Sequence, residues 1–105
     1  MSQAHVLVVD DDPAVRDVLQ EVLRQEEYSV STAEDGAAAI QAVKDSVIHI
    51  VITDFQLPDI DGLEIIDRLA KLDAKIIPIM MTGFGTIETA VRAMKSGAFD
   101  FITKP

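Results

Sequence analysis

The chain has no cysteine and no tryptophan, and aromatic residues make up 5% of its 105 residues. Without cysteine there is no disulfide, no thiolate zinc site and no cysteine nucleophile. Basic residues are also few: 9 Lys and Arg stand against 18 Asp and Glu, for a net charge of −9. Because a nucleic-acid-binding surface needs clustered Lys and Arg, we expect no direct binding of DNA or RNA by this chain.

Long apolar runs are missing as well. No run approaches the roughly 18 residues of a membrane span. The first five residues, Met1–His5, contain no basic segment followed by an apolar one, as a signal peptide would. We therefore expect a cytoplasmic chain with no membrane partner. With 49% hydrophobic and 26% charged residues, the composition is typical of one globular domain, residues 1–105.

Short β-branched runs alternate with segments of helical periodicity. Apolar residues recur at three- and four-residue spacing after Asp12, after Asp35 and after Gly62, and a fourth such segment ends near Gly97. The spacing predicts four helices. Between and around them, strands are predicted at residues 6–9, 28–32, 47–53, 76–81 and 99–103.

This alternation of strands and helices predicts an α/β fold with a doubly wound, five-stranded parallel sheet. Right-handed crossovers favour the flavodoxin-like strand order 2-1-3-4-5, with the first helix on one face and the next three on the other. The sequence stops at Pro105, so we expect the fifth helix, which would pair with the first, to be missing. Because the apolar face beside the first helix would then be uncovered, we expect the chain to self-associate through it.

Polar side chains follow four of the predicted strands, at the edge where ligands bind in such sheets. Asp10 and Asp11 follow the first strand, and Asp54 follows the third. Thr82 follows the fourth strand and Lys104 the fifth. Because strands one and three are neighbours in the predicted order, their acids are expected to meet.

Carboxylates gathered at one place repel each other, and a hard divalent cation such as Mg²⁺ relieves that repulsion. Together with the cation, a lysine ammonium and a threonine hydroxyl can neutralise and hydrogen-bond phosphoryl oxygens. Asp54 stands by itself at its strand end, facing the acids that can hold the metal. The residues therefore indicate Asp54 as a phosphoryl acceptor through an aspartyl phosphate.

Four motifs carry a resemblance that extends over the whole chain. They are Val8–Pro13, Thr53–Asp54 with the following Leu57–Pro58 and Asp61–Gly62, Met81–Gly83, and Lys104–Pro105. In this order they resemble the receiver domain of two-component response regulators. Residues 83–98 are similar to the branch of nitrogen regulators and enhancer-binding activators.

The resemblance implies a role for each site residue. Asp54 would be the phosphoacceptor, and Mg²⁺ would be held by Asp10, Asp11, Asp54 and the backbone carbonyl of Gln56. The remaining roles concern the response to phosphorylation. Thr82 would bind the phosphoryl group and move, Phe101 would change rotamer with it, and Lys104, aimed by a cis Lys104–Pro105 bond, would pair with the acyl phosphate.

The implied function is a switch and not an enzyme with turnover: a sensor histidine kinase would phosphorylate Asp54, and a changed conformation would control an output, by analogy transcription. Two alternatives differ in class. A phosphatase using an aspartyl phosphate would carry an acid two residues after the nucleophile, where this chain has Gln56. An interaction module would never be phosphorylated. Repeated release of phosphate would identify the enzyme.

Other conspicuous side chains have structural interpretations. Asp12, Asp35 and Asp61 are predicted to cap helices. Asp59 is predicted to be a loop acid without a particular role. His5 directly precedes one predicted strand and His49 falls in another, and neither has a metal-ligand partner nearby in sequence, so we interpret both as structural residues.

Overall fold

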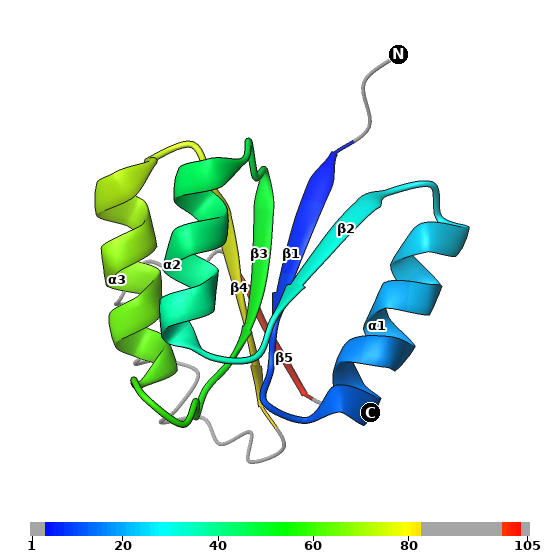
Figure 1. Cartoon of the computed structure of the whole chain (residues 1–105), viewed down its shortest axis with the longest axis horizontal. Coiled ribbons are helices and arrows are strands. Elements are labelled where there is room, and N and C mark those ends of the chain that lie inside the picture. The colour runs from blue at the N-terminus through cyan, green and yellow to red at the C-terminus, as the bar shows by residue number, and fades with distance from the viewer. Residues whose placement is uncertain (1–3, 83–99, 104–105) are drawn as a thin grey trace.

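A five-stranded parallel sheet lies between helices in the computed structural model, which describes residues 4–82 and 100–103 (Figure 1). The strand order is β2-β1-β3-β4-β5. The parallel arrangement β2-β1-β3-β4 confirms the predicted flavodoxin-like order of these strands. Strand β5 pairs in parallel with β4 at the edge of the sheet. The strands are β1 (His5–Val9), β2 (Ser29–Ala33), β3 (Ile50–Asp54), β4 (Ile77–Thr82) and β5 (Asp100–Thr103). The helices are α1 (Pro13–Gln25), α2 (Gly36–Asp45) and α3 (Gly62–Leu72).

The two faces of the sheet are covered by different helices (Figure 1). Side chains of β1 alternate between them: Leu7 and Val9 pack in the cluster that includes α2 and α3, whereas Val6 and Val8 pack toward α1. All four are buried. Because β1 is covered on both faces, its sequence is a continuous apolar run and not an alternating one.

One predicted strand begins too early. The sequence predicts a strand from Val47, but β3 begins at Ile50. Val47 is 73% exposed, and Ile48 is buried in the α2–α3 cluster as part of the connection from α2. The β-branched run continues from the connection into the strand, so composition does not mark the boundary. The bounds of β1, β2 and β4 lie within one residue of the prediction. The predicted fourth helix falls outside the described residues.

Each described helix begins after an aspartate whose carboxylate accepts a hydrogen bond from a backbone amide of the first turn. Asp12 accepts from Ala14 at 2.9 Å, Asp35 from Ala38 at 2.8 Å, and Asp61 from Leu63 at 2.7 Å. These caps satisfy amides that the helix itself leaves without a partner. The predicted capping roles of Asp12, Asp35 and Asp61 are confirmed.

Two histidines lie at the opposite edge of the sheet, where the strands begin. Nδ1 of His49 accepts the backbone N–H of His5 at 2.8 Å, and the His49 amide donates to the carbonyl of His5 at 2.9 Å. Nε2 of His5 lies 2.6 Å from Oγ of Ser31. The structural interpretation of both histidines is confirmed. Within the described residues, no helix has the length and apolar character needed to cross a bilayer.

Candidate functional site

The register of the sheet brings the carboxyl ends of the strands to one edge. Val9 lies opposite Thr53 in the β1–β3 pair, so the residues that follow them, Asp10 and Asp54, come together. Asp54 in turn lies opposite Met81 in the β3–β4 pair. Thr82 ends β4 at the same edge. The predicted convergence of strand-end residues is therefore a consequence of parallel pairing.

Three carboxylates meet there. Asp10, Asp11 and Asp54 each offer an oxygen, and these oxygens lie within 4.8 Å of one another; we call these residues the acidic cluster. Asp10 is fully buried and Asp54 is 7% exposed, whereas Asp11 is exposed. Two unit charges at that separation repel by roughly 3.5 kcal/mol at an effective dielectric of 20. Hard oxygen donors at this spacing, two of them buried, fit a divalent cation.

The backbone around Asp10 is fixed by three hydrogen bonds. Its amide donates to the carbonyl of Ala33 at 3.1 Å, and its carboxylate accepts the Asp12 amide at 2.9 Å. The guanidinium of Arg16 donates to the Asp10 carbonyl at 2.7 Å. Arg16 did not emerge from the sequence patterns, although its place one turn into the helix after an acidic run was the available signal. It brings a positive charge to the acidic cluster.

The backbone directly after Asp54 is held by β4 and by the start of α3. The Gly62 amide donates to the carbonyl of Phe55 at 2.8 Å, and the Phe55 amide donates to Met81 at 3.0 Å. Gly62 approaches the end of β3 so closely that a Cβ there would overlap the carbonyl oxygen of Asp54. Glycine is needed at this position for its lack of a side chain.

The loop between β3 and α3, residues 55–61, closes on itself and contacts α2. Gln56 and Asp61 form an antiparallel bridge. Farther along, the carboxylate of Asp59 accepts the amide of Gly36 at 2.8 Å and that of Ala37 at 3.0 Å. The hydrogen bond from Gly36 lowers the pKa of Asp59 below its ordinary value of 3.8, and desolvation opposes it. Asp59 is thus more than the loop acid that the sequence predicted.

The remaining predicted site residues are placed by backbone position. Thr82 lies opposite Thr103 in the β4–β5 pair, and Phe101 lies opposite Met80. The predicted roles of the Thr82 and Phe101 side chains fall outside what the structure describes. Lys104 and the predicted cis Lys104–Pro105 bond also lie outside the described residues.

Comparison with known proteins gives one family. The model of the response regulator receiver domain matches residues 6–105. The transcriptional regulatory protein ZraR of Klebsiella oxytoca is 36% identical over 103 residues, which are 98% of this chain and 23% of ZraR. The chain thus spans less than a quarter of the length of this curated relative.

Two solved structures show the same fold. The beryllofluoride-activated NtrC4 receiver domain dimer has a TM-score of 0.90 and 35% identity, and the match covers 96% of this chain and 84% of that one. A response regulator protein from Burkholderia pseudomallei, with a phosphorylated aspartic acid, a calcium ion and citrate, has a TM-score of 0.91 and 28% identity. That match covers 98% of this chain and 61% of the other.

The substitution Gly62→Ala is expected to lower the free energy of unfolding by about 2 kcal/mol, because the added methyl group must displace backbone atoms of Asp54 and Phe55. Urea unfolding measures the change. Gly36→Ala is the comparison in which the clash is with side chains, because its Cβ would meet Cγ2 of Ile60 and Cδ1 of Ile65 and both would have to shift. An equal free energy of unfolding for Gly62→Ala and the parent chain would contradict the close approach of Gly62 to the backbone of Asp54.

The contribution of Asp59 to stability is expected to depend on pH. Because its folded pKa is lowered, the stabilisation is fully present above the unfolded pKa of about 3.9 and is lost as the pH falls through the folded value. Asp59→Asn should cost up to about 1 kcal/mol at pH 7, a modest figure since the carboxylate is solvent-exposed. The difference from the parent should close below pH 4 in urea unfolding. A gap that stays constant from pH 7 to pH 3 would refute this.

Proposed function

Since the chain belongs to the response regulator receiver family, we propose that it accepts a phosphoryl group on Asp54 from a sensor histidine kinase and thereby switches conformation. The observation that carries the proposal is the acidic cluster: a nearly buried Asp54 faces Asp10 and Asp11 across neighbouring strands. The B. pseudomallei relative, with a phosphorylated aspartic acid and a calcium ion, supports the same chemistry.

Receiver domains bind Mg²⁺ at an acidic pocket, and the donor set of this chain fits that ion. Asp10, Asp11 and Asp54 would hold it, together with the backbone carbonyl of Gln56 on the following loop. When bound, Mg²⁺ neutralises charge on the carboxylates and on the oxygens of the transferring phosphoryl group. Arg16 and the Ala33 carbonyl keep the backbone of Asp10 in place for this role.

In the transfer step, a carboxylate oxygen of Asp54 attacks the phosphorus of phosphohistidine. An O–P bond forms as the N–P bond breaks, and the imidazole leaves with the electron pair and takes up a proton. Thr82, at the end of β4, would donate a hydrogen bond to the phosphoryl group, Lys104 would pair with its charge, and Phe101 would follow Thr82. The domain is thus modified once per signal.

We further propose that the output is transcription. The ZraR relative is a transcriptional regulatory protein. The match covers 98% of this chain but 23% of that protein. The receiver domain accounts for the phosphoryl switch, whereas the response would be executed by other parts of a longer protein. The cytoplasm, where kinases supply phosphohistidine, is the location that this proposal implies.

Incubation with Mg²⁺ and acetyl phosphate is expected to add one phosphoryl group to the parent chain and none to Asp54→Asn. Intact mass spectrometry measures the adduct. Asp12→Asn is the matched control, because Asp12 lies in the same acidic run but caps α1, so it should still give the adduct. An adduct on Asp54→Asn, or none on the folded parent, would sink the proposal. Continuous phosphate release without a stable adduct would favour the phosphatase alternative.

Self-association stays a prediction, with an apolar surface in its favour. Val18 and Val22 on α1 are 52% and 50% exposed. Ile102 is 38% exposed and lies opposite Met81, which belongs to the cluster on the α1 face. The NtrC4 relative is a receiver domain dimer. Light scattering at increasing concentration should show a mass above 11.4 kDa, and Val22→Lys should reduce it. A monomer at high concentration would contradict the prediction.

A further inference from the structure

We propose that Asp59 is a positioning residue for the metal site, because its contact with the N-terminus of α2 holds the 55–61 loop in the place from which Gln56 binds Mg²⁺. The inference rests on the proposed function, in which the Gln56 carbonyl is a metal ligand. Asp59 itself lies three residues beyond Gln56 and touches no member of the acidic cluster through the bonds described above. Its effect on the metal is therefore exerted through the loop.

The contact joins segments that are far apart in the chain. The two carboxylate oxygens of Asp59 accept the amides of Gly36 and Ala37, which lie 23 and 22 residues away. Asp35 accepts the amide of Ala38. The first amides of α2 are thus shared between a local cap and a distant one. A carboxylate at a helix N-terminus is also favoured by the helix dipole.

An apolar contact accompanies these bonds. The Cγ2 atom of Ile60 occupies the space that a Cβ on Gly36 would need. Ile60 also packs, partly buried, against the α2–α3 cluster. The loop is therefore fixed on α2 by one charged and one apolar side chain in succession. Two neighbouring contacts set both the position and the orientation of this part of the loop.

The other end of the loop is fixed to the sheet and to α3. The Phe55 amide donates to Met81, the Phe55 carbonyl accepts the Gly62 amide, and Gln56 bridges Asp61. Loss of the Asp59 contact would leave these bonds in place. Gln56 would then lie on a loop that is still attached to β4 and α3 but no longer attached to α2. We accordingly expect weaker metal binding and not its abolition.

The side of α2 that Asp59 contacts is also linked to the acidic cluster. The carbonyl of Ala33, at the end of β2, accepts the amide of Asp10 at 3.1 Å. Helix α2 begins at Gly36, three residues later. Asp59 therefore ties the loop that carries Gln56 to the same segment that fixes Asp10. The two flanks of the proposed metal site are held at a set separation by this contact.

The test is the Mg²⁺ dissociation constant of the full 105-residue chain, measured by isothermal titration calorimetry at pH 7. Asp59→Ala is expected to raise it about fivefold, the change that corresponds to roughly 1 kcal/mol. Asp59→Asn keeps one acceptor oxygen and should give a smaller increase. At saturating Mg²⁺, the rate of phosphorylation by acetyl phosphate should stay within about twofold of the parent rate, because Asp54 itself is not moved. Amide hydrogen exchange at Gly36 and Ala37 should accelerate in both variants.

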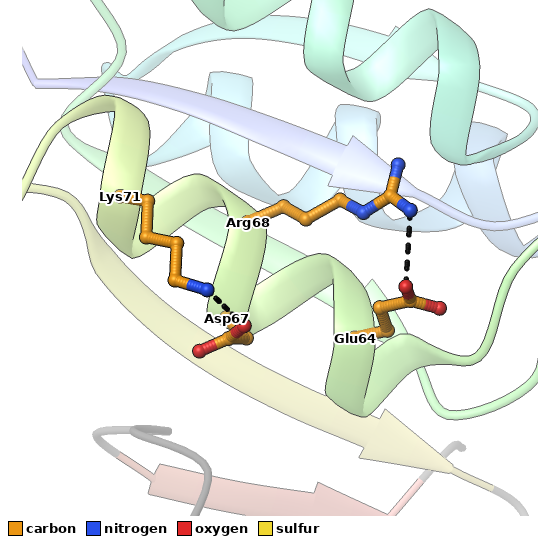
Figure 2. A network of polar contacts seen from close by, with 4 residues as sticks. All are labelled: Glu64, Asp67, Arg68 and Lys71. Atoms are coloured by element: carbon orange, nitrogen blue, oxygen red, sulfur yellow. Dashed lines mark hydrogen bonds and ion pairs between the residues drawn. The ribbon is translucent and has the colours of Figure 1, made fainter.

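Two control variants separate positioning from stability and from charge. Asp35→Ala removes a cap from the same helix, so it should lower stability to a similar extent without changing the Mg²⁺ dissociation constant. Glu64→Ala removes an acid that lines the same surface hollow as Asp59. Glu64 pairs within α3 with Arg68 at 3.0 Å, next to the Asp67–Lys71 pair at 3.1 Å (Figure 2). The Glu64→Ala variant should therefore leave the Mg²⁺ dissociation constant unchanged.

The outcomes are distinct. If Asp59→Ala binds Mg²⁺ with the parent dissociation constant while Gly36 exchange accelerates, the contact is lost without effect and the inference is overturned. An equal weakening in Asp35→Ala would also overturn it, since the effect would then follow helix stability. If the parent chain neither binds Mg²⁺ nor accepts a phosphoryl group, the proposed function fails and this inference fails with it.

Discussion

The rest of the structure depends on the placement of three negative charges at the carboxyl edge of a parallel sheet. Parallel pairing of β1 with β3 forces the residues after them together, and the covering helices bury two of the three carboxylates. A water-filled site would screen this repulsion, but a buried one cannot. Hydrogen bonds donated by Arg16 and Gly62, and one accepted by the Ala33 carbonyl, hold the backbone around Asp10 and Phe55 against this repulsion. Relief of this repulsion favours the binding of a divalent cation at the acidic cluster.

Aspartate has two opposite physical roles in this chain. Asp12, Asp35, Asp59 and Asp61 accept backbone amides at helix N-termini, where the helix dipole favours negative charge. Asp10 and Asp54 instead lie where negative charge is already concentrated. Removing a carboxylate of the first kind lowers stability, whereas the second kind is costly until a cation is bound. Residue type alone does not separate the two kinds, but position relative to strand ends and helix starts does.

Much of the fold could be predicted because its signals are local. Each strand of the interior is a short apolar run, and each described helix follows an aspartate cap, so β1 and α1 were recognisable from adjacent residues. Asp10, Asp11 and Asp54 followed from the strand order. The start of β3 was wrong because Val47 and Ile48 continue the β-branched pattern outside the strand. Arg16 was not singled out, and Asp59 and Gly62 were named without the contacts that they make, since each of the three acts through backbone atoms. For Asp59, those atoms belong to a helix 22 and 23 residues away.

In the proposed switch, the contact between Asp59 and α2 would supply restraint from outside the chemical site. A backbone carbonyl has no side chain by which its direction can be selected, so Gln56 can serve as a ligand only if its loop is held from elsewhere. The base of the loop is held by β4 and α3, and the apex by α2. Because the bond from Ala37 is exposed and the bond from Gly36 is only partly buried, both would be modest in energy and could be exchanged if the charge at Asp54 changed. Restraint of this strength would position the proposed Gln56 ligand in the resting state without preventing the loop from responding.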